Sequence, residues 1–362
     1  MTNNYASLYL GSTLFITKAN LAFMFLKSLV LIFLCLTMVA TIAQKPVISV
    51  LDSISNTSLR GLSVVNDKVV WCSGSNGKVA KSVNGGKTFV WKTVTGHEKR
   101  DFRDVEAFDA NTAVIMAIAE PAVILKTHDG GITWHKVFED TTKGMFLDAM
   151  DFLDDKEGVV VGDPVNGKFF FAYTKDAGDY WKPLNTDAKP DSGEAFFASS
   201  GSNIKVMRRQ IGGEPALLYA SGGTKSRLFY NEFPHGMVLP IVQGKESTGA
   251  NSIAVLENKA IVVGGDFTKE TASSNNCVLI DFTDGINLSF PTTPPNGYRS
   301  SVVFIDSQTL LTCGTSGVDI SYDGGNNWKL VSKESFHVVQ KAKHGKSIFL
   351  AGSNGRIAKI IL

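Results

Sequence analysis

Four short segments of the sequence repeat one pattern, and their spacing limits the fold more than any other feature. They are KSVNGGKTF (81–89), KTHDGGITW (126–134), YTKDAGDYW (173–181) and ISYDGGNNW (320–328). Their acidic or amide residues are 45, 47 and 147 residues apart, at Asn84, Asp129, Asp176 and Asp323. The last interval is three times 49, so two degenerate repeats fit inside it. A repeat of roughly 45–50 residues cannot bury its own core, and neighbouring repeats must pack against one another.

Each repeated segment has the chemistry of a tight turn between two strands. The shared pattern is S/T-x-D-x-G-x-x-W, with Asn and Phe replacing Asp and Trp in the first copy. The Asp or Asn accepts backbone N–H groups of its own turn, and the Gly adopts a positive φ. The aromatic residue then packs beneath the hairpin. This Asp-box pattern predicts a structural and non-catalytic role for Asn84, Asp129, Trp134, Asp176, Trp181, Asp323 and Trp328.

The sequence around each turn predicts a four-stranded unit. An opening strand, a second strand ending in Gly or a carboxylate, and a third strand precede the turn. The predicted units are 58–94, 101–138, 145–184, 193–242, 247–292 and 298–331. Residues 335–362 supply only three strands, and we expect KPVISVLDS (45–53) to supply the fourth. The prediction is an all-β, seven-bladed β-propeller over residues 44–362, with ring closure by the N-terminal strand of the mature chain.

Residues 1–43 have a composition unlike the rest of the chain. Lys27 is followed by an apolar stretch (28–38) and by a small-residue cleavage site that ends at Ala43. These are the three parts of a secretory signal peptide, and we expect translation to start at Met24. The sequence predicts an exported protein, periplasmic or secreted. The alternative is an uncleaved membrane anchor, although the apolar run of about 16 residues is shorter than a spanning helix requires.

Charge and cysteine content exclude several classes of function. The chain has 36 basic and 34 acidic residues, and residues 1–43 contain two of the lysines and no acid. The predicted mature chain is therefore balanced, which argues against nucleic acid or an anionic membrane as the main partner. Cys72, Cys277 and Cys313 form no CxxC pair and are expected to be small buried residues. No nucleotide fingerprint or metal-spaced histidine pair occurs, so no cofactor or metal is expected.

The predicted inner strands bring charged residues to one face of the central channel. Alignment of the opening strands gives seven equivalent positions: Arg60, Arg103, Leu147, Ala195, Asn251, Arg299 and His337. Two carboxyl residues directly follow these positions, Asp104 and Asp148. Three more come after second strands: Glu120, Asp163 and Asp266. One interpretation is a ligand site in which arginines bind a carboxylate and carboxylates accept hydroxyls or a lysine. In the other, Arg–Asp pairs lock neighbouring blades together and His337 is structural.

The repeat pattern, the opening-strand arginines and the signal segment resemble the Ycf48-like propellers. These are exported bacterial relatives of the photosystem II assembly factor, and they share the Asp-box with sialidases. The resemblance covers about residues 45–362. It implies a seven-bladed fold and an arginine patch that receives a client polypeptide. Arg60, Arg103 and Arg299 are the positions that would carry this patch, and the equivalent positions of the other blades lack Arg.

Three functional hypotheses follow. The first is a non-enzymatic binding or assembly module, expected to be a monomer, with a protein or peptide client or a carbohydrate as partner. The second is a glycoside hydrolase of sialidase type, because Tyr298 adjoins Arg299. The sialidase Arg-Ile-Pro motif is absent, however, and the corresponding region reads KPVIS. A two-carboxylate hydrolase could use Asp163 with Asp266 or Glu120. The third is an oxidoreductase, for which no nucleotide or CxxC motif is present.

Overall fold

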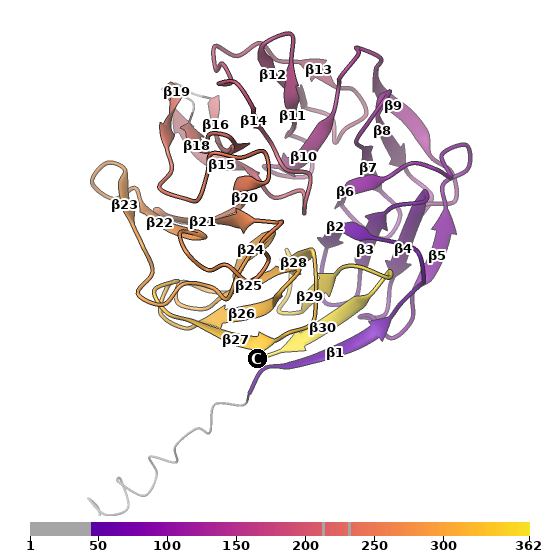
Figure 1. Ribbon diagram of the computed structural model, residues 1–362. Helices are drawn as coiled ribbons and strands as arrows, with labels where there is room; N and C mark the ends of the chain where they lie inside the picture. Colours follow the sequence, from indigo (N-terminus) through magenta and orange to yellow (C-terminus); the bar gives the residue numbers. More distant parts are fainter. Residues whose placement is uncertain (1–44, 212–213, 231–232) are drawn as a thin grey trace, which may run out of the picture. The chain divides into compact units, whose positions relative to one another are not determined.

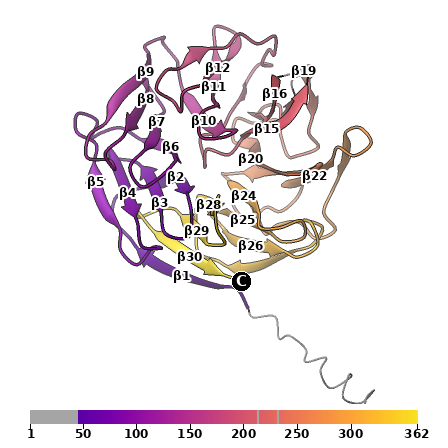
Figure 2. The same ribbon diagram turned by 180° about the vertical axis from the view of Figure 1, so that it is seen from behind.

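The computed structural model describes residues 45–211, 214–230 and 233–362, and the predicted signal segment lies outside these ranges. The regular elements of the described residues are β-strands, and they form seven sheets arranged as a β-propeller (Figure 1). Figure 2 shows the same ring of sheets from behind. The predicted all-β, seven-bladed fold is confirmed. In the described ranges we find no helix with the length and apolar character needed to span a bilayer.

The first three blades follow the chain in order, and each is a four-stranded antiparallel sheet. Blade 1 consists of β2 (Leu59–Val64), β3 (Val70–Gly74), β4 (Lys78–Ser82) and β5 (Val90–Thr93). Blade 2 consists of β6 (Phe102–Ala107), β7 (Ala113–Ala117), β8 (Ala122–Thr127) and β9 (His135–Asp140). Blade 3 consists of β10 (Leu147–Phe152), β11 (Gly158–Val165), β12 (Lys168–Thr174) and β13 (Lys182–Pro183).

Blades 4 and 5 share their chain segments in a way that the repeat did not predict. Blade 4 consists of β15 (Ile204–Ile211), β16 (Glu214–Ala220), β18 (Arg227–Tyr230) and β19 (Phe233–Val238). Blade 5 consists of β20 (Thr248–Leu256), β21 (Lys259–Asp266), β22 (Cys277–Asp281) and β23 (Asn287–Ser289). Two short strands, β14 (Glu194–Ala195) and β17 (Gly222–Gly223), extend the sheet of blade 5. The inner strand of blade 4 therefore begins nine residues after Ala195, the position that the alignment assigned to it.

The last two blades complete the propeller. Blade 6 consists of β24 (Ser301–Phe304), β25 (Leu310–Gly314), β26 (Gly317–Ser321) and β27 (Trp328–Ser332). Blade 7 consists of β28 (Val338–Lys341), β29 (Ile348–Ala351), β30 (Ile357–Ile361) and β1 (Val47–Asp52). In this sheet β1 pairs antiparallel with β30, and Val47 lies opposite Ile361. Blade 7 thus combines strands from both ends of the described chain.

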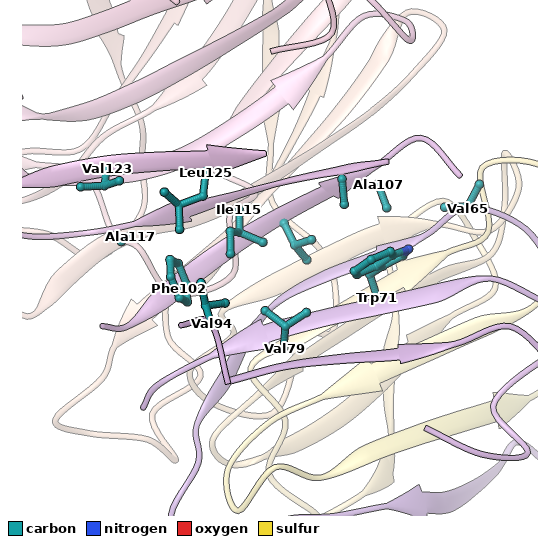
Figure 3. Packing of buried hydrophobic residues seen from close by; sticks show 12 residues of the cluster. Val65, Trp71, Val79, Val94, Phe102, Ala107, Ile115, Ala117, Val123 and Leu125 are labelled. Carbon is teal, nitrogen blue, oxygen red and sulfur yellow. The ribbon is translucent and has the colours of Figure 1, made fainter. Parts of the chain in front are cut away.

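The hydrophobic core lies between neighbouring blades. Trp71 and Val79 of blade 1 pack with Ile115 and Leu125 of blade 2 (Figure 3). Trp71 is completely buried, and its Nε1 donates a hydrogen bond to the backbone oxygen of Asp109 in blade 2 at 3.0 Å. Because each blade covers the apolar face of the next, the ring is stabilised by contacts between blades and not by separate cores.

The four repeated segments form turns with one hydrogen-bond pattern, each between the third and fourth strands of a blade. In blade 2 the Thr127 hydroxyl donates to Asp129 at 2.8 Å and accepts the Gly131 N–H at 2.9 Å. Asp129 also accepts the N–H groups of Ile132 and Thr133 at 2.9 Å each. The equivalent hydroxyl-to-side-chain bonds are Ser82–Asn84, Thr174–Asp176 and Ser321–Asp323. These side chains satisfy their own turns and are not available to a ligand.

Candidate functional site

A cavity of about 500 Å³ opens at the starts of the inner strands, and we call it the channel pocket. Five of the nine predicted ligand residues line it: Arg60, Arg103, Asp148, Asp163 and His337. Phe146, Phe197 and Phe267 supply aromatic walls, and the last is 45% exposed. Aromatic walls with a few convergent polar groups are typical of a binding site.

β-Bulges aim the inner-strand residues into this pocket. The pairing register shifts across Arg60 in blade 1, Arg103 in blade 2, Asp148 in blade 3 and Asn251 in blade 5. A bulged residue has no direct partner on the neighbouring strand, so its side chain can turn away from the sheet. The structurally equivalent residue of blade 3 is therefore Asp148, one position after the Leu147 of the sequence alignment.

The floor of the channel pocket is an irregular segment, residues 197–203, which we call the channel segment. Its backbone and serine side chains bind several blades. The Ser199 oxygen accepts a hydrogen bond from Arg60 Nη1 at 3.2 Å. The Ser200 hydroxyl donates to the Ser300 oxygen at 2.6 Å, and the Ser202 hydroxyl is 2.7 Å from that of Ser252. All three serines are buried, so the segment fills the channel below the pocket.

The two pocket arginines differ in their partners. Arg103 Nε donates to the Asp101 carboxylate at 2.8 Å, and its guanidinium lies 5.9 Å from the centroid of the Phe146 ring. Arg60 forms no ion pair with any residue of the described ranges. Burial lowers the pKa of Arg60, and the positive charge of Arg103 lowers it further, while Tyr298 and Asp101 partly oppose this fall without forming an ion pair. A guanidinium nevertheless remains protonated in proteins, so Arg60 is a cation without a carboxylate partner.

The two pocket carboxyl groups are unusually poor in partners. Asp148 is fully buried, and neither of its carboxyl oxygens has a hydrogen-bond partner. Burial raises its pKa far above the usual range, and the nearby Asp163 raises it further. Arg103 and nearby backbone N–H groups partly oppose this rise. Burial likewise raises the pKa of Asp163 to about 6, although its Oδ1 accepts the Phe196 N–H at 2.9 Å.

Neutral polar groups complete the pocket. His337 is 6% exposed, and burial together with Arg60 and Arg103 lowers its pKa to about 3. Its ring is therefore uncharged near neutral pH, and its Nε2 lies 3.0 Å from the Ser353 hydroxyl. The Tyr298 hydroxyl donates to Asn251 at 2.7 Å, and burial raises its pKa to about 12. Near neutral pH both side chains can offer hydrogen bonds but no charge.

Arg299 does not line the channel pocket. It precedes the pocket residue Ser300, and its guanidinium forms an ion pair with Asp319 in which both side chains are fully buried. Arg299 lies two residues before β24, and its guanidinium binds Asp319 of β26 and not a group of the channel. The expectation of three pocket arginines is therefore wrong for this side chain, because it is used to hold blade 6 together.

Three predicted carboxyl groups also lie outside the channel pocket. Asp104 lines a second cavity of about 450 Å³ at the ends of the inner strands, where it accepts the Met150 N–H at 2.8 Å. Glu120 is exposed and accepts the Gly144 N–H at 2.8 Å. Asp266 accepts the N–H and hydroxyl of Thr268 in its own turn. All three stabilise local structure.

The second cavity contains ion pairs between blades. Lys343 of blade 7 pairs with Glu106 of blade 2, and Lys205 of blade 4 pairs with Asp151 of blade 3 at 2.6 Å. These pairs differ from the predicted Arg–Asp pairs between neighbouring blades: both use lysine, and only Lys205–Asp151 joins adjacent blades. Paired charges of this kind leave no free group for a ligand.

A larger cavity of about 570 Å³ lies between blades 3 and 4, and none of the predicted site residues lines it. Tyr173 of blade 3 and Tyr219 of blade 4 are among its walls. The outer strand of blade 3, β13, has only two residues, so the outer part of this blade leaves a gap in the packing.

Within the described ranges, no group of three His, Cys, Asp or Glu side chains is arranged to hold a metal ion.

Sequence reasoning missed the aromatic walls and the floor of the channel pocket. Phe197 and the channel segment belong to the run FFASSGSN (196–203). Clusters of Ser, Gly and Asn are typical of ordinary loops, so the only distinguishing signal in this run is the pair of phenylalanines before it. It could not show which blades the segment would contact.

Comparisons with known proteins agree with the fold. No family model and no curated protein matches the sequence. A solved structure of YCF48 bound to a D1 peptide is 16% identical, covers 89% of this chain and 96% of its own, and has a TM-score of 0.60. YCF48 from Cyanidioschyzon merolae is 16% identical, with coverages of 86% and 98% and a TM-score of 0.57. The Neurospora crassa Pan2 WD40 domain is 12% identical, with coverages of 86% and 94% and a TM-score of 0.57. The chain therefore has the propeller fold that YCF48 and WD40 domains share.

Proposed function

We propose that this chain is a non-enzymatic binding module that receives a peptide or protein client at the channel pocket. The observation that carries the proposal is Arg60, a half-buried cation that lines the pocket and forms no ion pair among the described residues. A guanidinium can bind a carboxylate through two parallel hydrogen bonds. A client carboxylate, at a C-terminus or on a side chain, would supply the missing negative charge.

Two further observations support a peptide client. Phe146, Phe197 and Phe267 offer apolar surface beside Arg60, which suits the side chains next to a bound carboxylate. A structure with the same fold is described as YCF48 bound to a D1 peptide. At 16% identity this likeness establishes the fold alone, so the peptide client is part of our proposal.

The sialidase-type alternative has less support from the geometry. A sialidase binds the substrate carboxylate with three arginines, whereas Arg299 is buried against Asp319 and only Arg60 and Arg103 line the pocket. The Tyr298 hydroxyl donates to the amide oxygen of Asn251 and not to a glutamate. A non-enzymatic client site therefore accounts better for these contacts.

We also propose that the protein is exported, with residues 1–43 removed as a signal peptide. The support is the sequence of this segment, with Lys27, the apolar stretch 28–38 and the cleavage site at Ala43. Mass spectrometry of the protein recovered from the periplasm or medium tests this proposal. A mature chain that begins at Gln44 is expected, and a cytoplasmic protein that retains this segment would contradict it.

Binding of a random octapeptide library tests the channel-pocket proposal. Fluorescein-labelled peptides with a free C-terminal carboxylate are compared with the amidated library. Arg60→Gln is expected to weaken binding of the free acids at least about tenfold, or about 1.4 kcal/mol. Arg356→Gln is the control, because Arg356 lies outside the pocket and pairs with Glu334 at 3.7 Å. Equal binding by parent and Arg60→Gln would overturn the proposal.

A further inference from the structure

Asp148 is the least satisfied side chain of the channel pocket. It is fully buried and lines the cavity, and neither carboxyl oxygen has a hydrogen-bond partner among the described residues. The nearby N–H groups of Asp163 and Ala198 only partly oppose the rise in its pKa. Arg103 is close enough to act on it electrostatically, but its Nε donates to Asp101 and its Nη1 to the Ala198 oxygen at 3.5 Å. A buried polar group without a partner costs free energy, and such groups are rare in folded proteins. Both oxygens are also closed to solvent, so a cation in the pocket acts on Asp148 through its electric field, from a position beside Asp163.

Asp163 is the more exposed of the two carboxyl residues that line the channel pocket. It lies within β11, is half-buried and is close enough to Asp148 to raise the pKa of Asp148. Its Oδ1 accepts the Phe196 N–H, and its Oδ2 forms no hydrogen bond within the described ranges. A donor that reaches Asp163 from the pocket therefore enters the field of both carboxyl groups. A positively charged donor would also favour ionisation of the pair.

The charges of the pocket are separated by blade. Arg60 lies in blade 1, whereas Asp148 and Asp163 lie in blade 3. Arg103 of blade 2 lies close enough to lower the pKa of Asp148, but it pairs with Asp101. The aromatic walls include Phe146 next to blade 3 and the channel-segment residue Phe197. Lysine and arginine place an alkyl stem on apolar surface while the charged head reaches a polar partner. The pocket thus offers an anion-binding end, an apolar wall and a carboxyl end.

We propose that Asp148 and Asp163 form a cation subsite, so that the preferred client carries a lysine or arginine side chain within its last two residues. Arg60 holds the client carboxylate, the stem of the basic residue packs on Phe197, and its head binds Asp163 with Asp148 behind it. This inference rests on the proposed function, because it names the class of client that the same pocket selects. A client with only neutral or acidic residues near its terminus leaves the carboxyl pair unsatisfied.

The test uses labelled peptides that differ at one position. Octapeptides ending in lysine, norleucine or glutamate are titrated against the parent chain by fluorescence anisotropy. We expect the lysine peptide to bind at least about tenfold more tightly than the norleucine peptide, which has a similar stem and no charge. In Asp163→Asn the ratio of the lysine-peptide affinity to the norleucine-peptide affinity should fall to within about twofold.

Further variants separate the subsite from its surroundings. Asp148→Asn keeps the shape of the side chain and should also reduce the ratio of the lysine-peptide affinity to the norleucine-peptide affinity. Asp284→Asn removes an exposed carboxylate outside the pocket and should leave it unchanged. Thermal melting of each variant confirms that it is folded before its ratio is interpreted. A parent chain that binds lysine and norleucine peptides equally overturns the cation subsite alone. A parent chain that binds no peptide overturns the proposed function and this inference with it.

Discussion

Arg299 and Asp319 form an ion pair in which both side chains are completely buried. Arg299 Nε donates to Asp319 Oδ2 at 2.7 Å, and Arg299 Nη1 donates to the Tyr298 oxygen at 2.8 Å. Asn296 Nδ2 donates to Asp319 Oδ1 at 2.7 Å. The pair therefore connects the segment that leads into blade 6 with the third strand of that blade. Its partners are all internal, which explains why Arg299 contributes nothing to the channel pocket.

Removal of the Arg299 charge should destabilise the protein strongly. Arg299→Met leaves the Asp319 carboxylate buried without its counter-ion, and breaking a buried pair in this way typically costs about 3–5 kcal/mol. Urea denaturation of parent and variant measures the change in the free energy of unfolding. Arg356→Met is the matched control, since the more exposed Arg356–Glu334 pair should contribute less than about 1 kcal/mol. A loss below about 1 kcal/mol for Arg299→Met would show that the pair is not structural.

The channel segment should be sensitive to the size of residue 201. Gly201 has a φ of +63°, and a Cβ atom there would lie 2.3 Å from the Asp104 carboxyl carbon. Gly201→Ala should therefore lower the unfolding free energy more than Gly144→Ala, a control with φ +84° and no atom within 4 Å of a Cβ. Gly144→Ala measures only the cost of placing a Cβ atom at a positive φ, which is about 1 kcal/mol. In the Asp104→Ala background, Gly201→Ala should cost less, and an unchanged cost would mean that this contact is not limiting.

The seven-bladed architecture could be predicted because the turn pattern recurs at nearly constant intervals along the sequence. The separations between Asp129, Asp176 and Asp323 placed the two degenerate blades before any strand was assigned. The inner strand of blade 4 was misplaced because Ala195 begins a stretch that resembles an opening strand. In the structure that stretch pairs with the sheet of blade 5 and continues into the channel segment. Such long-range contacts leave no periodic pattern in the sequence.

The site was predictable to within one residue of register. Arg60 and Arg103 were placed correctly in the channel pocket, whereas Arg299 was assigned to it in error. The bulge at Asp148 and the ion pair of Arg299 with Asp319 decide which side chains face the channel. A bulge has no reliable sequence signal here, and a shift of one residue moves a side chain to the opposite face of the sheet.

Loss of a turn carboxylate should affect stability without affecting the channel pocket. Asp129→Ala removes the acceptor of the Ile132 and Thr133 N–H groups. We expect a lower melting temperature and unchanged peptide affinity, because the turn joins β8 and β9 on the outer side of blade 2. The turn bonds lower the pKa of Asp129, so its contribution is present above its unfolded pKa and is lost as the pH falls. Weaker peptide binding by a folded Asp129→Ala would contradict this separation.

His337 should make the fold sensitive to acid. Its pKa is about 3 in the folded state and about 6.5 in an unfolded chain, so the unfolded state takes up the proton first as the pH falls. The stabilising contribution is complete above about pH 6.5 and is lost progressively toward pH 3. His337→Gln cannot take up this proton, and its unfolding free energy should fall less between pH 7 and pH 4 than that of the parent. If the unfolding free energies of parent and variant changed equally with pH, His337 would not be desolvated in the folded state.

Asp163 should have the opposite dependence on pH. Its pKa is about 6 in the folded state and about 3.8 in an unfolded chain, so its charge is unfavourable in the folded state above pH 6. The destabilisation is complete at pH 7 and disappears as the pH falls below about 4. Asp163→Asn should therefore be about 1–3 kcal/mol more stable than the parent at pH 7 and equally stable near pH 4. Urea titrations at both pH values measure this difference. If the variant were less stable at pH 7, an internal partner would already satisfy Asp163, and the pocket would have less need of a cationic client.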